Sequence, residues 1–336
     1  MTALLAKHVA EILVLASVNG GPAEAKDVFA KASQEVTLHA AVVARRGRRC
    51  TLYTNAPKPK TRCRVAPLPE DVRTRWSKIE PTKPWYNNVP AGGFKVAPIA
   101  YASRTIAETT PSIRADYAPL QRRGIGVGGT MRYAVRVTLA DGSEHTSAAP
   151  DGAYDGGVPA AKDARRVTWR RSDDYLGYLT ELGNVPYVFG SANIGRERHQ
   201  AERGVGVDCA DLMVYGLRRL GHDVPYVSSR TMGPHSRAVV GPVEARRGKV
   251  YVDADGEPIA VGEGGLRPGD WIIFDGHVGA FYADAGTKGV FDADDWMIHT
   301  AWAEVAIQRM DDTHYGRQPF SVRRAKALTR SVSLAP

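Results

Sequence analysis

Residues 206–221 read GVDCADLMVYGLRRLG, and this stretch decides how the second half of the chain is expected to fold. Its apolar and small side chains recur every three or four residues, which is the spacing of one face of an α-helix. The residues of this face are Cys209, Leu212, Met213, Gly216, Leu217 and Leu220. Asp208 stands where a helix needs an N-cap, and Gly221 stands where helices commonly end. The pattern predicts a helix that begins at Cys209.

A cysteine in the first turn of a helix is a candidate nucleophile. The unpaired backbone N–H groups and the helix dipole favour a negative charge at that place. They can lower the pKa of a thiol from its free value of about 8.5, and the thiolate is the nucleophilic form. We therefore expect Cys209 to be a catalytic nucleophile. The alternative is a small buried cysteine that only packs the helix.

Two histidines further along the chain could serve this nucleophile. His277 follows the turn Asp275-Gly276 and opens the apolar run HVGAFY, so it is expected at the rim of a sheet. His299 ends the run WMIH and could lie on the adjacent strand, where it would orient the ring of His277. The alternative for His299 is a purely structural role. A metal site built from Cys209, His277 and His299 is a further alternative, but we expect no metal and no cofactor.

The rest of the second half predicts one more helix and then short strands. Ser172 is expected to cap a helix that ends before Gly183. From residue 249 onward, short apolar runs separated by turn residues predict strands. These strands are expected at 250–253, 271–275, 277–282, 297–300 and 304–308. A helix that carries the nucleophile and packs on an antiparallel sheet is an α+β layout.

The first half of the chain reads as strands and turns. The clearest strand is 130–139, where apolar residues from Met131 to Leu139 alternate with polar ones such as Arg132 and Arg136. This period of two predicts one buried face and one face in water. Small β-barrels or a sandwich would fit. Residues 148–163 (AAPDGAYDGGVPAAKD) read as a linker, so we expect a β-rich region over 26–165 and a catalytic domain over 166–336.

The positive charge is concentrated in the first half. Residues 1–171 hold 27 Lys and Arg against 14 Asp and Glu, a net charge of +13, whereas residues 172–336 hold 18 against 22, a net charge of −4. A basic region predicts an anionic partner, and an anionic cell-wall polymer and a phospholipid surface are both candidates. No nucleic-acid motif is recognisable, so nucleic acid is not expected. The alternative is a charge that only aids solubility.

The chain has three cysteines. Cys50 and Cys63 flank the turn-forming residues 55–60 (NAPKPK), and in a hairpin they would face each other as a disulfide. That pairing leaves Cys209 as the odd thiol, which in a secreted protein marks a reactive or intermolecular cysteine. The alternative is three unrelated reduced thiols.

Residues 1–25 allow two interpretations. The apolar core 12–18, followed by Ala23-Glu24-Ala25, fits a cleaved signal peptide. Because Lys7 and Glu11 are unusual in such a segment, an amphipathic helix over residues 3–18 is the alternative. No run approaches the roughly 18 apolar residues of a membrane-spanning helix, so no membrane span is expected.

Five segments, in this order, resemble the NlpC family of bacterial cell-wall cysteine peptidases. They are residues 184–190 (NVPYVFG), 206–221 (GVDCADLMVYGLRRLG), 266–275 (LRPGDWIIFD), 277–281 (HVGAF) and 297–300 (MIHT). The resemblance covers about residues 172–310. It implies a papain-like α+β catalytic domain. Many relatives carry SH3-like domains, so the β-rich region before the catalytic domain could consist of small barrels of that type.

The resemblance also assigns roles. It makes Cys209 the nucleophile, His277 the base and His299 the orienting third residue. Tyr187 matches a tyrosine placed beside the nucleophile, where its hydroxyl could help to hold the oxyanion, and Asp208 matches the residue before the nucleophile. The implied reaction is hydrolysis of an amide in peptidoglycan stem peptides, between D-glutamate and a diamino acid. The implied location is the cell envelope of a bacterium.

Two features depart from the family pattern. Ala210 and Asp211 stand where serine and glycine are usual, and Asp211 could favour a cationic substrate group or could face solvent. Residues 191–205 insert a charged loop before the nucleophile. Two alternative functions follow: another amidase or acyltransferase that uses the same residues, and a cell-wall-binding protein whose catalytic domain is inactive.

Overall fold

The computed structural model describes residues 8–148, 152–154, 164–194 and 198–330. The structure is mostly β, with 44% of residues in strands and 11% helical, so the expected α+β class with a papain-like catalytic domain is wrong. The physical reason is the shortness of the helices in the described ranges. Helices α2 (Tyr175–Leu179) and α4 (Lys326–Arg330) have five residues each, and only α3 (Cys209–Arg219) exceeds two turns. No helix in these ranges is long and apolar enough to span a bilayer.

The chain divides into two compact units. Unit 1 comprises Met1–Lys83 and Lys95–Arg170, and unit 2 comprises Pro84–Phe94 and Arg171–Pro336. A segment of the first half, Pro84–Phe94, therefore belongs to the unit that carries Cys209. Most of the linker expected at 148–163 lies outside the described residues, since only residue 148 and the short strand Gly152–Tyr154 are described.

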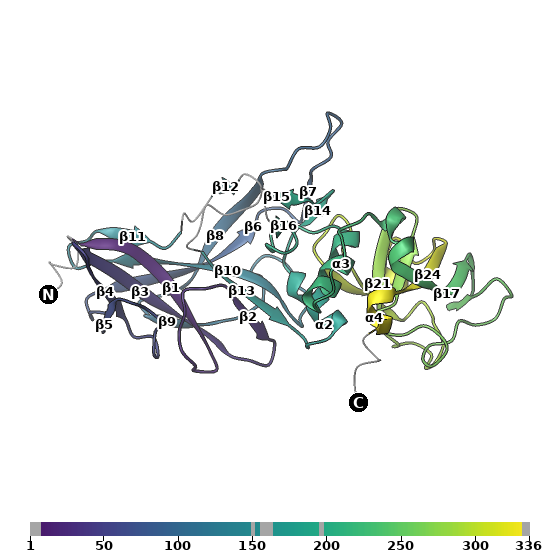
Figure 1. The fold of residues 1–336 in the computed structure, drawn as a ribbon, viewed down its shortest axis with the longest axis horizontal. Coiled ribbons are helices and arrows are strands. Elements are labelled where there is room, and N and C mark those ends of the chain that lie inside the picture. The colour runs from purple at the N-terminus through teal and green to yellow at the C-terminus, as the bar shows by residue number, and fades with distance from the viewer. Residues whose placement is uncertain (1–7, 149–151, 155–163, 195–197, 331–336) are drawn as a thin grey trace. The chain divides into compact units, whose positions relative to one another are not determined.

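Unit 1 consists of two sheets (Figure 1). The first has the strand order β1-β3-β4-β5, with β9 paired to β3, and its strands are β1 (Val9–Val18), β3 (Val36–Arg46), β4 (Arg49–Thr54), β5 (Arg64–Ala66) and β9 (Ser112–Ala115). The second has the order β12-β8-β6-β10-β13-β2, with β11 paired to β10, and its strands are β2 (Val28–Lys31), β6 (Arg73–Pro81), β8 (Ile99–Glu108), β10 (Gly129–Thr138), β11 (Glu144–Thr146), β12 (Gly152–Tyr154) and β13 (Arg165–Arg170).

One hydrophobic core joins the two sheets of unit 1. Leu38 and Ala40 of β3 pack in the same cluster as Tyr133 of β10. Two sheets that share one core form a sandwich, so the expected small barrels are wrong and the sandwich is the alternative that holds. Strand β3 also buries its other face, because Ala41 and Val43 pack in a second cluster. This explains why residues 40–44 (AAVVA) are apolar throughout and do not alternate.

Strand β10 confirms half of its predicted pattern. The alternating apolar residues Met131, Tyr133, Val135 and Val137 all lie in the core. The face predicted to be in water is largely buried, since Arg132 is only 4% exposed and its guanidinium lies 5.3 Å from the ring centre of Tyr101. Arginine can be buried in this way when its aliphatic stem and planar head both find partners.

The disulfide between Cys50 and Cys63 is present, which confirms the predicted pair. The local geometry differs from the expected hairpin, because β4 and β5 are parallel, with Thr51 opposite Arg64. The bridge joins residues with a sequence separation of 13. Closing a loop of this length lowers the entropy of the unfolded chain and is expected to stabilise the fold by roughly 3 kcal/mol.

Residues 9–18 form strand β1, which pairs with β3 from Val9 to Val18. Ile12, Val14 and Ala16 lie in the core of the sandwich. The described part of the amphipathic helix expected over 3–18 is thus a strand. This segment forms a strand because β3 pairs with its backbone hydrogen-bonding groups. That pairing is non-local, so the sequence of residues 3–18 alone does not decide between helix and strand.

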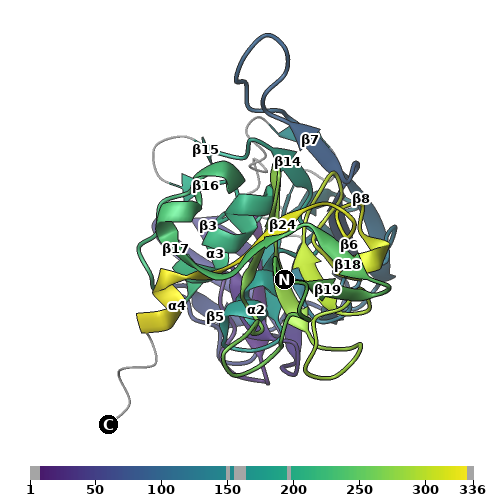
Figure 2. The same cartoon turned by 90° about the vertical axis from the view of Figure 1, so that its right-hand side faces the viewer.

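Unit 2 is built around a six-stranded antiparallel sheet with the order β17-β24-β20-β21-β22-β23. Its strands are β17 (Ser236–Val243), β20 (Trp271–Phe274), β21 (His277–Ala283), β22 (Trp296–His299), β23 (Ala306–Arg309) and β24 (Phe320–Ala325). Three two-stranded pairs surround it, made by β7 (Trp85–Asn87) with β14 (Tyr187–Phe189), β15 (Asn193–Ile194) with β16 (Arg198–His199), and β18 (Ala245–Arg247) with β19 (Val250–Val252). Figure 2 shows this unit with β7 and β14 side by side.

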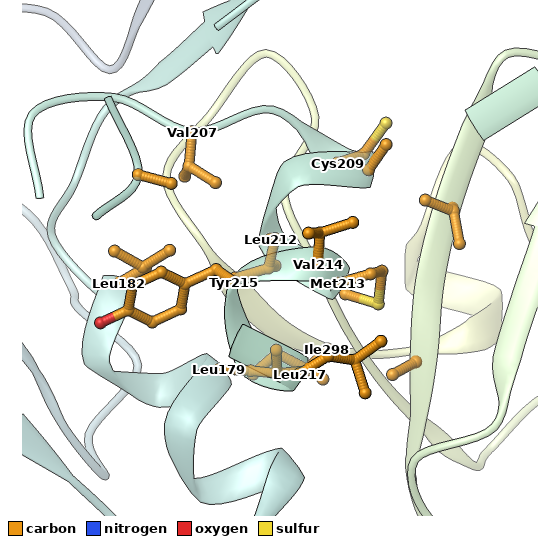
Figure 3. Close-up of a cluster of buried hydrophobic side chains, with 14 of the residues drawn as sticks. Leu179, Leu182, Val207, Cys209, Leu212, Met213, Val214, Tyr215, Leu217 and Ile298 are labelled. Atoms are coloured by element: carbon orange, nitrogen blue, oxygen red, sulfur yellow. The ribbon is translucent and has the colours of Figure 1, made fainter. Parts of the chain in front are cut away.

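The central sheet of unit 2 is buried on both faces. On one face Val278, Ala280 and Ile298 pack against the apolar stripe of α3. Figure 3 shows this cluster, with Cys209 at one end of the helix and Ile298 near Leu217, towards the other end. On the other face Phe281 and Met297 lie in a second cluster. The sheet therefore fixes α3 from one side while its opposite face is supported by aromatic residues.

Helix α2 is pinned to α3 by a close approach and an ion pair. A Cβ at Gly216 would lie 2.5 Å from a methyl group of Leu179 and 2.8 Å from the ring of Tyr175, so only glycine fits there. The fully buried Glu181 accepts two hydrogen bonds from the guanidinium of Arg219, at 2.7 and 3.0 Å. The predicted cap at Ser172 is wrong, because the cap of α2 is Asp174, which accepts from the N–H of Gly177.

Candidate active site

Asp208 fixes the start of α3 and so the position of Cys209. Its backbone is extended and its Oδ1 accepts from the N–H of Asp211 at 2.9 Å, which is the N-cap arrangement. At the other end the chain leaves the helix through Gly221, whose φ of +89° favours glycine. The helix predicted from residue 209 is confirmed.

The thiol of Cys209 is 8% exposed and lies against the first residues of β21. The backbone N–H of Val278 donates to it. Burial raises the pKa of Cys209 to about 12, and the neighbouring Asp208 carboxylate acts in the same direction, while the N–H groups of Val278 and Ala210 oppose the rise. The expected lowering of this pKa by the helix N-terminus is therefore outweighed, and the resting residue is a neutral thiol.

His277, His299 and Gln308 form a chain of hydrogen bonds, and its first member directly precedes Val278, whose N–H donates to this thiol. His277 Nε2 lies 3.0 Å from His299 Nδ1, and His299 Nε2 lies 2.8 Å from Gln308 Oε1. Burial lowers the pKa of His277 to about 2 and also lowers the pKa of His299, so both rings are neutral. Because the Gln308 oxygen can only accept, His299 Nε2 donates, His299 Nδ1 accepts, and His277 Nε2 donates.

This chain leaves the Nδ1 atom of His277 without a proton. A neutral imidazole with an unprotonated Nδ1 can accept the proton of a thiol. The residue that follows His277 is Val278, whose N–H contacts Cys209. The three hydrogen-bonded residues therefore set the tautomer that a base for Cys209 requires.

Aromatic rings hold His277 in this orientation. The ring of Tyr315 is stacked on that of His277, with centroids 3.9 Å apart and planes 16° apart, and Phe274 is stacked at 5.9 Å. Gly279 provides the room for His299, because a Cβ there would lie 2.5 Å from the sulfur of Met297 and 3.1 Å from the Cβ of His299. The glycine of the HVGAF run is thus required by packing around the two histidines.

Asp208 and Asp211 place two carboxyl groups beside the nucleophile, the first half-buried and the second buried. Burial raises the pKa of Asp208 to about 6, against the N–H groups that donate to it, and raises the pKa of Asp211 well above its usual range. Asp211 accepts from the hydroxyl of Ser191 and lies 3.3 Å from His199 Nε2. Asp211 is therefore a buried residue, and the interpretation that it faces solvent is wrong.

The inserted segment 191–205 is buried at 199–201 and 204–205 and carries the exposed residues Asn193 and Arg198. His199 is buried and stacked on Tyr226 with ring centroids 3.7 Å apart, and Gln200 is fully buried. Gln200 Oε1 accepts from Asn88 Nδ2 at 2.8 Å, which connects the insertion to the segment Pro84–Phe94. Residues 195–197 of the insertion lie outside the described residues.

Tyr187, on β14, completes the set of predicted residues. It is buried, and this burial raises the pKa of its hydroxyl, so the hydroxyl keeps its proton. A protonated hydroxyl close to the nucleophile can donate to a developing oxyanion. In the parallel pair of β7 and β14, Tyr187 lies opposite Trp85.

The structure thus gathers the predicted residues into one region of unit 2. The predicted residues are Cys209, His277, His299, Tyr187, Asp208 and Asp211. Sequence reasoning missed Gln308, Tyr315, Ser191 and His199. A signal for Gln308 was present, because it lies in the strand expected at 304–308, which follows the strand that ends in His299. In the structure Gln308 of β23 lies opposite Met297 of β22, and its long side chain reaches His299 on the same strand. Among the described residues, no three His, Cys, Asp or Glu side chains gather as a metal-binding group would.

Comparisons with known proteins give one structural likeness. No family model and no curated protein matches the chain. The chain is similar to a crystal structure of an NlpC/P60 family protein from Bacillus cereus, with 14% sequence identity and a TM-score of 0.24. The similarity covers 87% of this chain and 80% of the other.

Proposed function

We propose that this chain is a cysteine-dependent hydrolase that cleaves an amide bond in cell-wall stem peptides, of the D-glutamyl–diamino acid endopeptidase type. The observation that carries the proposal is the hydrogen-bonded chain of His277, His299 and Gln308, which leaves Nδ1 of His277 unprotonated. The next residue, Val278, donates its N–H to Cys209 at the N-terminus of α3. The five sequence motifs that resemble the NlpC family support the choice of substrate.

The first chemical step is attack of the sulfur on the amide carbonyl. Because the resting thiol is neutral, its proton passes to His277 Nδ1 as the bond between sulfur and carbon forms. The oxygen of the carbonyl becomes an oxyanion, to which the Tyr187 hydroxyl and the backbone N–H of Cys209 can donate. His299 and Gln308 keep the ring of His277 oriented while it is protonated.

The remaining steps release the two products. His277 gives its proton to the leaving amine as the carbon–nitrogen bond breaks, and an acyl-enzyme remains on Cys209. Water then attacks the thioester and loses a proton to His277, which restores the thiol and frees a carboxylic acid. Asp208 is charged above a pKa of about 6, so at neutral pH it favours a cationic amino group of the substrate beside the nucleophile.

Purified peptidoglycan and soluble stem peptides test this function directly. Digestion followed by mass spectrometry should show cleavage between D-glutamate and the diamino acid. Cys209→Ala and His277→Ala should abolish the products, whereas His314→Ala should not, because His314 is exposed and lies outside the hydrogen-bonded chain. Products that persist in Cys209→Ala, or cleavage at an unrelated bond, would contradict the proposal.

The basic unit 1 supplies the proposed partner surface, an anionic polymer of the cell wall. Six exposed arginines lie around the β3–β4 hairpin and the neighbouring β5, and we call this set the arginine edge. They are Arg45, Arg46, Arg48, Arg49, Arg62 and Arg64. The disulfide between Cys50 and Cys63 ties the two segments together. A structural disulfide suits an oxidising compartment, which supports a place in the cell envelope.

A pull-down on sacculi tests this partner. Full-length Cys209→Ala protein should bind at low salt and release as salt rises, since exposed charges are screened beyond about 8 Å at physiological ionic strength. The double change Arg46→Glu and Arg49→Glu should weaken binding far more than Arg104→Glu with Arg123→Glu, which alters the net charge equally elsewhere on unit 1. Equal effects of the two pairs would refute a localised site.

A further inference from the structure

Three large aromatic side chains remain exposed on unit 2, and two of them contact the third, Trp302. Trp302 is 50% exposed, Trp85 is 45% exposed and Phe189 is 42% exposed. The ring of Phe189 is stacked on that of Trp302, with centroids 5.6 Å apart and planes 22° apart. The ring of Trp85 meets Trp302 edge-on at 5.3 Å. We call these three residues the aromatic platform.

The three residues come from distant parts of the chain. Trp85 lies on β7 and Phe189 on β14, and the parallel pairing of these strands brings them to one side of the unit (Figure 2). Trp302 follows β22 in a turn and has a φ of +54°. A bulky residue in the left-handed region costs on the order of 1–3 kcal/mol, and such residues cluster at functional sites. A strained tryptophan that is half exposed gains little from burial, which indicates a role in binding.

The platform is continuous with the candidate active site. Trp302 also contacts the ring of Tyr187, with centroids 5.3 Å apart. Tyr187 forms a parallel bridge with Val207, two residues before Cys209. Trp302 is three residues after His299. A group that rests on the platform would therefore belong to a molecule that also reaches the nucleophile.

The chemistry of the proposed substrate limits what that group can be. This step rests on the proposed function. Stem peptides consist of small and charged amino acids, so they offer no large apolar surface for three aromatic rings. The peptide is attached to an N-acetylated amino sugar, whose ring is uncharged and presents C–H groups on its faces. The negative face of an aromatic π-system attracts such hydrogens, and aromatic side chains commonly line ligand sites.

We propose that the aromatic platform binds the amino-sugar ring next to the stem peptide, so that the enzyme prefers peptides still joined to the glycan. Trp302 is the central contact because it touches both of the other rings and Tyr187. The platform determines specificity and takes no part in the proton transfers at Cys209.

The test compares two substrates with the same peptide, one that carries the disaccharide and one that is free. For the unchanged protein, kcat/KM should be about tenfold or more higher with the disaccharide. Trp302→Asn should bring the ratio close to one. Asparagine is chosen because it tolerates the left-handed backbone. Phe94→Ala is the matched control, because Phe94 is exposed in the segment Pro84–Phe94, which also carries Trp85, but Phe94 is not part of the aromatic platform.

A binding measurement separates the two proposals. The disaccharide alone should quench the tryptophan fluorescence of Cys209→Ala protein, and Trp302→Asn should remove that response. Absence of hydrolysis with intact disaccharide binding would refute the proposed function and leave the platform standing. A preference ratio of one in the unchanged protein, or a ratio that Trp302→Asn does not alter, would overturn the platform proposal.

Discussion

Replacing Asp208 with asparagine is expected to make Cys209 more reactive at neutral pH. The structure places the carboxylate directly before the nucleophile, where it opposes ionisation of the thiol. Asparagine is as good an N-cap as aspartate, so helix α3 keeps its first turn while the charge is removed. The change therefore isolates the electrostatic effect.

The size of the expected rate increase follows from the causes that raise the pKa of the Cys209 thiol. Its pKa rises from 9.0 to about 12, so at pH 7.5 the thiolate fraction is roughly a thousandfold smaller than for an unshifted thiol, or about 4 kcal/mol. Burial is the larger cause and Asp208 the second. A like charge within several ångströms, at an effective dielectric constant of about 20, contributes on the order of one to two pKa units. Asp208→Asn should thus speed alkylation at least about tenfold.

The assay is the rate of iodoacetamide alkylation of Cys209 as a function of pH, with the unfolded protein as the reference near 8.5. The pKa of Asp208 is raised to about 6, so its charge is present above that pH and absent below it. The difference between the two proteins should therefore be full above pH 7 and fade below pH 6. His277→Ala should change the rate little, because the resting imidazole is neutral.

Two results would refute this reasoning. If the unchanged Cys209 titrates at or below the free-thiol value, a thiolate–imidazolium pair exists at rest and burial does not dominate. If Asp208→Asn leaves the profile unchanged, the carboxylate does not act on the thiol. Thermal unfolding of both proteins serves as the control for an intact fold.

Two further predictions concern the hydrogen-bonded chain and the support of α3. Gln308→Leu removes the acceptor for His299 Nε2 and should lower kcat by about tenfold to a hundredfold, because the histidine rings lose their orientation. Gln308→Glu keeps an acceptor but adds a negative charge that favours protonated histidine, so the acid limb of the pH–rate profile should move to higher pH. Identical pH–rate profiles for the unchanged protein and the two variants would contradict the role of Gln308 in setting the tautomer. Glu181→Ala leaves Arg219 without its carboxylate and should lower the free energy of unfolding in urea by about 3–5 kcal/mol. The control Glu202→Ala breaks the more exposed pair with Arg218 and should lower it by about 1 kcal/mol or less. Equal losses in the two variants would contradict the argument that burial makes the Glu181–Arg219 pair important.

Much of the candidate site could be predicted because its signals are local. The helix from Cys209 follows from apolar spacing, the Asp208 cap and the terminal Gly221, and all three hold in the structure. The strand that begins at His277 follows from a turn and an apolar run. The fold class could not be predicted in the same way, because the resemblance suggested a catalytic domain with a helical layer, whereas the helices beside α3 are only five residues long.

By itself, the sequence determined where the elements of the site begin and which side chains they carry, since caps, turns and periodicity act within a few residues. Only the tertiary structure decided the state of those side chains. Burial by residues far along the chain raises the pKa of Cys209, whereas the local helix terminus predicted a lower one. Strand register, also non-local, brings Gln308 to His299 and Trp85 to Tyr187. Solvation and register depend on what the rest of the chain places nearby, so no short stretch of sequence contains them.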